Sequence, residues 1–473
     1  MRSGGNAAIS ILGQATPQIA SLLITIVAAR YLSPSDYGVY ALALVFAELN
    51  ITITYTGYYY FIINSKSDDR SVLSTFFWIM LAIGTVFGTV LFVGADPLAR
   101  LFRNEELVLL LACFALLQPF QSITGWASAA LIRAQLMRRL FITVAITDLV
   151  ALVIGIGLLL WWQSLLGLVV YRIVLVGLKV VAFCIVVPQS PKWMFDLSLA
   201  KQATRYAAGL YGARLLNFFS RFGTDLILAF LFSTAESGLY RFANRLANGA
   251  VDIVAQPLQR FAEKSFGHAA RTNASLDTLV AQYLSANIFM MGGAAIAIAV
   301  LSHSVVAVLF QPAYLAAVPV VYALALLSAA RSANLLIVPV FAARHRTSIA
   351  FWHDLVWTSV MLCTILFVAP FGFQTLAYAQ AATMIFTSFG AIFVIAYFGK
   401  VAVNAAVINA AKVIVLLMAY VAATYFAYQA ILGALGETAL ALGAGLFTAA
   451  LLGLAATAVV VKLNVVDPRV FAD

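Results

Sequence analysis

Long apolar stretches alternate with short polar segments along the whole chain. Each stretch holds about 20 residues or more, which is the length that a helix needs to cross the hydrocarbon core of a bilayer. The pattern predicts about fourteen such helices, or about twelve if one pair merges. The predicted helices are residues 7–30, 37–63, 71–95, 107–131, 141–162, 165–188, 206–232, 238–261, 278–302, 317–342, 350–370, 373–398, 412–432 and 437–461. We therefore expect an all-α polytopic membrane protein.

The composition supports this expectation. The 473 residues are 64% hydrophobic and 10% charged, whereas a soluble domain carries about 25% charged residues. A soluble enzyme and a disordered chain are both excluded, because neither tolerates so much apolar surface. The three cysteines and four histidines form no cluster with ligand spacing, and no nucleotide loop or catalytic triad is present. We predict no metal, no cofactor and no enzymatic activity.

The net charge is +10, and the positions of the basic residues along the chain decide how it is interpreted. In a soluble protein this excess would suggest a nucleic-acid partner, but in a membrane protein basic residues mark the cytoplasmic loops. With the N-terminus in the cytoplasm, 18 loop cations fall on the cytoplasmic side and three, Arg30, Arg100 and Arg103, on the other. The bias predicts cytoplasmic termini, an even number of spans and no nucleic-acid partner.

A weak internal repeat occurs at an offset of 200 residues. Residues 29–43 and 229–243 share five of fifteen positions, within the turn that joins two predicted helices. The identical pairs are Ala29/Ala229, Ser33/Ser233, Gly38/Gly238, Tyr40/Tyr240 and Ala43/Ala243. Asp36 and Glu236 also preserve an acidic residue. Chance similarity between two helical hairpins is the alternative.

The repeat predicts two lobes of six helices each with the same orientation in the membrane, because the first span matches the seventh. The N-terminal lobe would be residues 1–188 and the C-terminal lobe residues 206–398. The segment between the lobes, residues 189–205, is expected to form a short helix in the membrane interface, with an ordinary amphipathic linker as the alternative. Residues 399–473 would add two helices and a tail. Alternating access between the lobes is the mechanism that this arrangement favours.

Polar side chains gather on one face of four predicted helices, at spacings close to the 100° turn per residue of an α-helix. In the seventh and eighth helices they are Arg214, Asn217, Arg221, Asp225, Arg241, Asn244, Arg245, Asn248 and Asp252. In the first and second they are Gln14, Gln18, Ser21, Thr25, Glu48, Thr52, Tyr55 and Tyr59. A charge at bilayer depth costs roughly 2.5–3.5 kcal/mol, so these residues are expected to face protein or water.

The repeat register superimposes these faces. Gln14 corresponds to Arg214, and Glu48 corresponds to Asn248. We therefore expect a water-accessible central cavity lined by the first, second, seventh and eighth helices. Its four arginines suit an anionic ligand, because the guanidinium fork matches phosphate oxygens.

Simple ion pairing is an alternative for several of these charges. Arg221 and Asp225 lie four residues apart and can pair along one helix. Asp225 and Asp252 can carry a coupling ion or proton, or only balance arginines. Arg172 and Lys179 lie on one face of the sixth helix and can snorkel or pair with Asp148.

The opening of the chain resembles a known family. The Gly13-Gln14 helix followed by Ala-Ala-Arg30-Tyr-Leu-Ser-Pro-Ser-Asp-Tyr-Gly38-Val-Tyr-Ala-Leu-Ala is similar to the start of polysaccharide-transporter (Wzx-type) flippases. Their superfamily includes multidrug exporters and the peptidoglycan lipid flippases, whose N-terminal signature is missing here. The resemblance implies two six-helix lobes around a V-shaped central cavity, with two extra C-terminal helices.

The resemblance also implies an activity, namely moving an undecaprenyl-diphosphate-linked oligosaccharide across the bacterial cytoplasmic membrane for surface polysaccharides such as exopolysaccharide or O-antigen. By position it places Arg214, Arg221, Arg241 and Arg245 against the diphosphate or acidic sugars. The further candidates for substrate binding are Asn217, Asn248, Gln14, Gln18 and Glu48, with Asp225 and Asp252 as candidates for ion coupling. Expected partners are the lipid-linked oligosaccharide, membrane lipids and other polysaccharide-assembly membrane proteins.

Two other functions are compatible with a membrane protein of this size. A multidrug exporter of the same superfamily would need an acidic or neutral site for cationic drugs, which the four arginines disfavour. A membrane oligosaccharide polymerase or ligase would place its catalytic residues in a large outer loop, and the outer loops predicted here are short.

Overall fold

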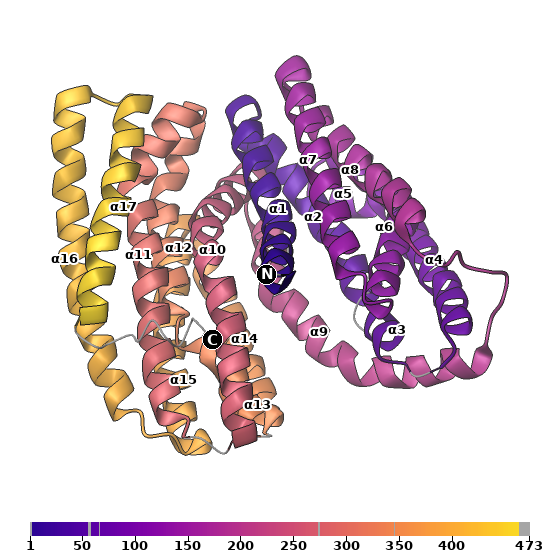
Figure 1. The fold of residues 1–473 in the computed structure, drawn as a ribbon. Coiled ribbons are helices and arrows are strands. Elements are labelled where there is room, and N and C mark those ends of the chain that lie inside the picture. The colour runs from indigo at the N-terminus through magenta and orange to yellow at the C-terminus, as the bar shows by residue number, and fades with distance from the viewer. Residues whose placement is uncertain (1, 55–57, 66, 273–274, 345, 463–473) are drawn as a thin grey trace. The chain divides into compact units, whose positions relative to one another are not determined.

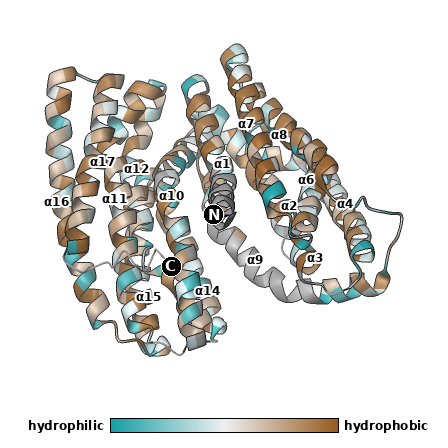
Figure 2. Ribbon diagram, in the orientation of Figure 1, coloured by the Kyte–Doolittle hydropathy of each residue, from teal (hydrophilic) through white to brown (hydrophobic). Residues whose placement is uncertain are grey.

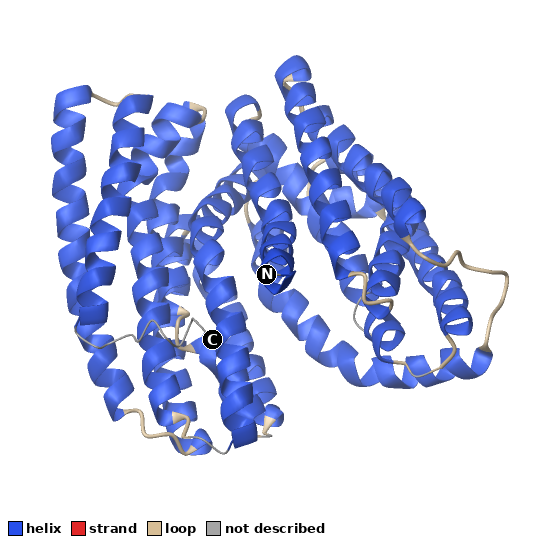
Figure 3. Ribbon diagram, in the orientation of Figure 1, coloured by secondary structure: helices blue, strands red, loops and turns tan. Residues whose placement is uncertain are grey.

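The computed structural model describes residues 2–54, 58–65, 67–272, 275–344 and 346–462 (Figure 1). In these residues the regular structure is helical throughout (Figure 3). The first part of the chain forms α1 (Arg2–Tyr31), α2 (Pro34–Thr54), α3 (Tyr60–Asn64), α4 (Asp69–Val93), α5 (Ala95–Leu101), α6 (Glu106–Arg133), α7 (Met137–Trp162), α8 (Leu165–Val186) and α9 (Leu197–Leu231). The second part forms α10 (Thr234–Thr272), α11 (Asp277–Leu309), η2 (Pro312–Ala317), α12 (Val318–Ala330), η3 (Asn334–Leu336), α13 (Ile337–Ala343), α14 (Thr347–Val368), η4 (Ala369–Phe371), α15 (Phe373–Gly399), α16 (Asn404–Leu435) and α17 (Ala439–Lys462).

The chain divides into two compact units, Met1–Arg241 and Phe242–Asp473. The division falls inside α10, beyond the linker at which the sequence predicts the boundary between lobes. The physical reason is that α9 packs against α2 and therefore belongs with the first unit. The assignment of six helices to each lobe stays a prediction.

In the first unit, α4 packs along α6, while α1 and α8 both pack along α7. Small residues allow these close approaches: a Cβ added to Gly88 of α4 would lie 2.6 Å from the Ala115 carbonyl oxygen of α6, and one added to Gly155 of α7 would lie 2.5 Å from the Tyr171 ring of α8. Close packing through small residues replaces the hydrophobic effect as the force that associates helices within lipid.

In the second unit, α11, α16 and α17 lie side by side (Figure 1), and α15 packs against both α12 and α14. Hydrophobic residues predominate along these helices (Figure 2). Val415, Phe426 and Phe447 on α16 and α17 each expose about two thirds or more of their surface. Such surfaces are stable only against acyl chains.

Among the described residues, ten helical segments are long and apolar enough to cross a membrane. They comprise α4, α6, α7, α8, α11, the segment from η2 to α13, α14 with η4, α15, α16 and α17. The predicted all-α membrane fold is confirmed, and the chain is a multi-pass membrane protein. The four remaining long helices, α1, α2, α9 and α10, are those in which the sequence predicts polar faces. The total of fourteen spans stays a prediction.

One predicted helix, residues 317–342, is broken in the structure. α12 ends at Ala330, a turn and the short η3 follow, and α13 begins only at Ile337. Pro339 lies in the first turn of α13, where its missing N–H leaves no helical bond unmade. In an uninterrupted helix the same proline would clash with the carbonyl of Leu335, so the chain breaks just before it.

The interfacial helix predicted over residues 189–205 also differs. Residues up to Asp196 are not helical, because Pro188 and Pro191 interrupt the helical bonding. Helix begins at Leu197 as the first turn of α9, where the Asp196 carboxylate accepts from backbone N–H groups. The extended part is held on α4, where Trp193 stacks on Trp78 at a centroid distance of 4.3 Å.

Candidate functional site

The start of α10 carries the best defined charged contact of the predicted polar faces. Arg241 donates from Nη1 to Oδ2 of Asp225 on α9, at 2.7 Å. The arginine side chain is 20% exposed and the aspartate 11%. The residues are 16 positions apart, so the pair joins two helices. The sequence offers Arg221 as another partner of Asp225, and the side chain of Arg221 lies outside the described part of the structure.

Glu48 on α2 has its own arginine. Arg172 of α8 lies 3.7 Å away, measured from Nη2 to Oε1. The carboxylate remains one third exposed, so the pair is open on one side. Thr52, predicted on the same polar face, donates its hydroxyl to the Glu48 carbonyl and is therefore partly occupied by its own helix.

A buried amide contact lies between Glu48 and Thr52 in the sequence of α2 and was missed by sequence reasoning. Asn50 donates from Nδ2 to Oε1 of Gln118 on α6 at 2.8 Å, and Gln118 donates onward to the Phe114 carbonyl. Both amide side chains are buried. Only the presence of a lone amide in an apolar helix could have signalled it, and that signal names no partner.

In the second unit, α10 continues with a polar ladder. Asn248 donates to Asn244 one turn earlier and accepts from Ser328 of α12. Asp252, one turn later, pairs with Arg331 at the end of α12. The sequence places Arg331 in the membrane but not among the candidate site residues.

The structure describes the side chains of only some of the remaining predicted site residues. Arg245 is half-buried on α10, in the same turn as Asn244 and Asn248. The side chains of five others lie outside the described part of the structure. These are Gln14, Gln18, Arg214, Asn217 and Arg221.

A further ion pair, on α7 and α8, has a buried carboxylate. Lys179 of α8 lies 2.9 Å from Oδ1 of Asp148 on α7, and the aspartate side chain is only 4% exposed. This is the pairing that the sequence offers as one alternative for the basic face of the sixth predicted helix. The buried carboxylate stabilises packing and is out of reach of a ligand, although the Lys179 side chain is 24% exposed.

The two repeat-related turns have the same local geometry. Ser33 donates its hydroxyl to Asp36 at 2.8 Å while Asp36 N–H donates back at 3.2 Å. Ser233 and Glu236 form the same capping box at 2.9 and 3.2 Å. The second turn thus repeats the first in structure as well as in sequence.

The two turns also meet, through glycine. A Cβ added to Gly38 would lie 2.1 Å from the carbonyl oxygen of Thr234, and one added to Gly238 would lie 1.9 Å from that of Pro34. The hydroxyls of Ser35 and Thr234 are 2.9 Å apart across the contact. The contact is reciprocal, and only glycine allows the starts of α2 and α10 to approach this closely.

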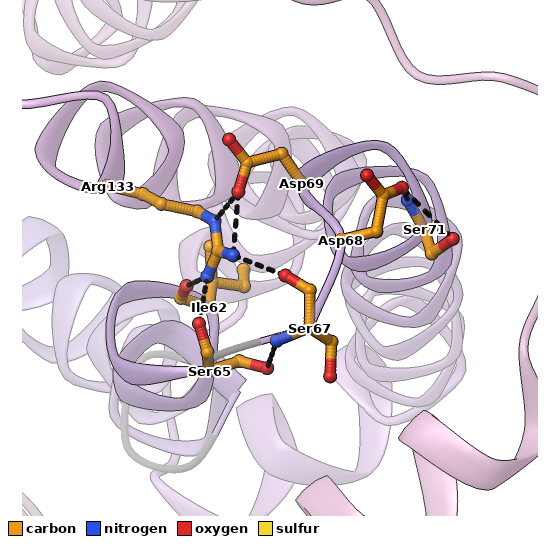
Figure 4. A network of polar contacts seen from close by, with 7 residues as sticks. All are labelled: Ile62, Ser65, Ser67, Asp68, Asp69, Ser71 and Arg133. Carbon is orange, nitrogen blue, oxygen red and sulfur yellow. Dashed lines mark hydrogen bonds and ion pairs between the residues drawn. The ribbon is translucent and has the colours of Figure 1, made fainter.

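Arg133, at the end of α6, organises a loop rather than a ligand site (Figure 4). It donates to the carbonyls of Ile62, Ser65 and Ser67 at 2.6–2.8 Å and to the Asp69 carboxylate at 2.7 Å. These bonds satisfy carbonyls at the end of α3 that the helix leaves without partners. With 10% of its side chain exposed, Arg133 fixes the turn before α4.

A family model described as "Polysaccharide biosynthesis protein" matches residues 27–319, more than half of the chain. The chain belongs to this family. The succinoglycan biosynthesis transport protein ExoT of Rhizobium meliloti (strain 1021) is 25% identical to it over 239 residues. That match covers 50% of this chain and 48% of ExoT, so it spans about half the length of that relative.

Two solved structures share the fold of this polysaccharide biosynthesis protein. Lipid II flippase MurJ, in an inward closed conformation, superposes with a TM-score of 0.74 at 12% identity and covers 96% of this chain and 99% of MurJ. An inward-facing multidrug resistance MATE family transporter of the MOP superfamily gives 0.61 at 13% identity, with 83% and 97% covered. The resemblance noted from the sequence is confirmed at the level of family and fold.

Proposed function

We propose that this protein is a flippase that moves a polyprenyl-diphosphate-linked oligosaccharide across the bacterial cytoplasmic membrane during surface polysaccharide biosynthesis. The observation that carries the proposal is Arg241, a partly exposed arginine held by Asp225 between two helices of a membrane protein in a polysaccharide biosynthesis family. An ionised group within a membrane helix is costly, so such a group is usually retained for a function. ExoT, a transport protein of succinoglycan biosynthesis, supports the same class of substrate.

The substrate would bind through its charged headgroup. Arg241 and Arg245, with Arg214 and Arg221, supply guanidinium groups that pair with two phosphate oxygens at once. Asn217, Asn248, Gln14, Gln18 and Glu48 would hydrogen-bond the sugars. The chain's own aspartates hold the arginines in the absence of substrate, as Asp225 holds Arg241.

Transport would proceed by alternating access. The distribution of loop cations supports cytoplasmic termini, which would put the two glycine turns on the outer side. The contact between Gly38 and Gly238 would then close the outer end while the headgroup enters from the cytoplasm. Release would require the turns to separate, which would break the Ser35–Thr234 hydroxyl contact and the glycine backbone contacts.

Asp225 and Asp252 are the candidates for ion coupling. Each balances an arginine, so a proton or cation that neutralises the carboxylate would free the arginine at the same time. A gradient could in this way drive the exchange between substrate-bound and empty states.

A deletion strain tests the function directly. We expect lipid-linked repeat units to accumulate on the cytoplasmic side of the membrane and surface polysaccharide to disappear, with both restored by the wild-type gene. Extraction of the lipid-linked pool, combined with a glycosidase or lectin that cannot cross the membrane, measures the sidedness. Normal sidedness together with lost efflux of organic cations would instead indicate a drug exporter.

Cross-linking tests the mechanism. S35C and T234C, in a chain with Cys113, Cys184 and Cys363 replaced by serine or alanine, would be joined by oxidation or by a short bifunctional thiol reagent. We expect cross-linking to block export and reduction of the disulfide to restore it. Each single cysteine serves as the control. Unimpaired export by the fully cross-linked protein would contradict alternating access through this contact.

A further inference from the structure

The break between α12 and α13 is held together by side chains that an unbroken helix would not need. Ser388 of α15 donates to the Ala330 carbonyl, and Asn287 of α11 donates to the Ser332 carbonyl at 3.1 Å. Asn334 donates to Ser388 at 2.9 Å. Backbone groups freed within a membrane must find partners, and here two neighbouring helices supply them. The break is therefore a built feature, and broken membrane helices commonly border ligand sites in transporters.

Arg331 is the first residue of this break. Its Nη2 pairs with Asp252 on α10. Its Nε is buried without a hydrogen-bond partner in the part of the chain that the structure describes. The guanidinium therefore holds a single carboxylate and has donors to spare.

The exposure of the carboxylate distinguishes this pair from the Lys179–Asp148 pair of the first unit. The Asp252 side chain is 40% exposed and the Asp148 side chain 4%, while the cations Arg331 and Lys179 are similarly exposed, at 26% and 24%. The Asp252 carboxylate is open enough for another anion to compete for its arginine.

We propose that Arg331 is an additional anion-binding residue and that Asp252 is its exchangeable counterion, which a diphosphate headgroup displaces. This inference rests on the proposed function, because it takes the substrate to be a lipid-borne diphosphate. A diphosphate offers the guanidinium two oxygens and more charge than one carboxylate. Asp252 holds Arg331 in position when the site is empty, and it recovers the arginine when the substrate leaves.

The exchange makes opposite predictions for the two partners. In D252N the diphosphate no longer competes with a carboxylate, so we expect binding about tenfold tighter and slower release. In R331Q we expect binding about tenfold weaker. In the double variant the D252N gain should vanish, because the freed arginine is absent.

Binding is measured on the purified full-length protein in detergent, with farnesyl diphosphate as the probe and farnesol as the uncharged control. Inorganic pyrophosphate is used in parallel. We expect the D252N gain with both diphosphates, since the headgroup carries it. A gain with farnesyl diphosphate alone would overturn recognition of the diphosphate, and an equal gain with farnesol would do the same.

S328A is the matched control, because it removes a polar contact between α10 and α12 without touching either charge. R331K preserves the charge but lacks the fork, so we expect a folded protein with weaker diphosphate binding. Thermal unfolding reports whether each variant is folded. An affinity in D252N that is unchanged or lower, or a gain that persists in the double variant, would show that the pair is only structural.

The two proposals can fail separately. If the deletion strain accumulates inward-facing lipid-linked units while D252N binds the probe like wild type, only the counterion exchange is overturned. If the binding changes appear but the deletion strain exports normally, the flippase assignment fails and a diphosphate site remains.

Discussion

The helices α1, α2, α9 and α10 and the ten apolar helices deal with polar residues in different ways. In the ten apolar helices a charge is rare, and the carboxylate of the Lys179–Asp148 pair on α7 and α8 is buried. On α10 the charged groups pair with residues of other helices but remain partly exposed, as Arg241 and Asp252 do. The presence of a charge in a membrane helix therefore does not by itself mark a ligand site. The exposure of the carboxylate separates the two kinds, at 4% for Asp148 against 11% for Asp225 and 40% for Asp252.

The largest expected effect concerns Arg241. R241A removes a charge-assisted contact and leaves Asp225 without this partner, and we expect surface polysaccharide to fall roughly tenfold to a hundredfold. The reason is that the arginine holds the substrate headgroup in the proposed mechanism. The measurement is surface polysaccharide per cell in the complemented deletion strain, normalised to the amount of protein in the membrane.

R100A is the matched control for this prediction. Arg100 also pairs with an aspartate, Asp96, at 2.8 Å, but its side chain is 78% exposed at the end of α5. We expect no measurable loss of export. Equal losses in R241A and R100A would remove the distinction between membrane and surface pairs.

The second effect concerns the Lys179–Asp148 pair. D148N leaves Lys179 charged and without its partner within the membrane helices, and we expect a loss of about 3–5 kcal/mol in the free energy of unfolding. The double variant D148N/K179M should recover most of this loss and retain export, because no charge remains to be compensated. Thermal or denaturant unfolding in detergent, together with the export assay, checks both. A stable double variant that fails to export would place the pair among the functional residues.

The third effect concerns the glycine contact. G38A and G238A each drive a Cβ into a backbone carbonyl, so we expect a loss of about 1–3 kcal/mol in unfolding free energy and a population shifted away from the closed turns. Accessibility of S35C to a thiol reagent measures that shift, and export should fall with it.

Gly157 on α7 provides the control for the glycine substitutions. A Cβ added there meets no atom within 4 Å, so G157A should change stability by less than about 1 kcal/mol, with helix propensity favouring alanine. If G157A were as damaging as G238A, the effect would arise from helix substitution in general rather than from the contact.

The smallest effect concerns Asp196, outside the membrane-spanning helices. Hydrogen bonds from the Ser198 hydroxyl and from the N–H groups of Leu199 and Ser198 lower the pKa of this carboxyl. A carboxyl whose pKa is lower in the folded state stabilises the protein above the ordinary aspartate pKa. This contribution is lost as the pH falls through the folded-state value. D196A should therefore lower the unfolding temperature at neutral pH, and the difference from wild type should shrink in acid.

Much of the fold follows from local patterns. Every predicted span meets a helix among the described residues, because apolar periodicity and the Ser-x-x-acid turns are properties of neighbouring positions. The break at Arg331 was not predicted, because one proline in an apolar stretch is compatible with either a kink or a new helix start. The extended linker was not predicted, because its position depends on the stacking of Trp193 on Trp78, more than a hundred residues away.

The candidate site divides in the same way. The sequence alone determined that this is a membrane protein of many helices, that charges collect on particular helix faces, and that the turn before α2 recurs before α10. Only the tertiary structure decided that Asp225 pairs with Arg241, Glu48 with Arg172 and Asp252 with Arg331. A helix face is defined by residues three and four apart, whereas an ion pair between helices depends on which helices pack together and how each is rotated. Those two choices are made by packing over the whole unit, and no local pattern contains them.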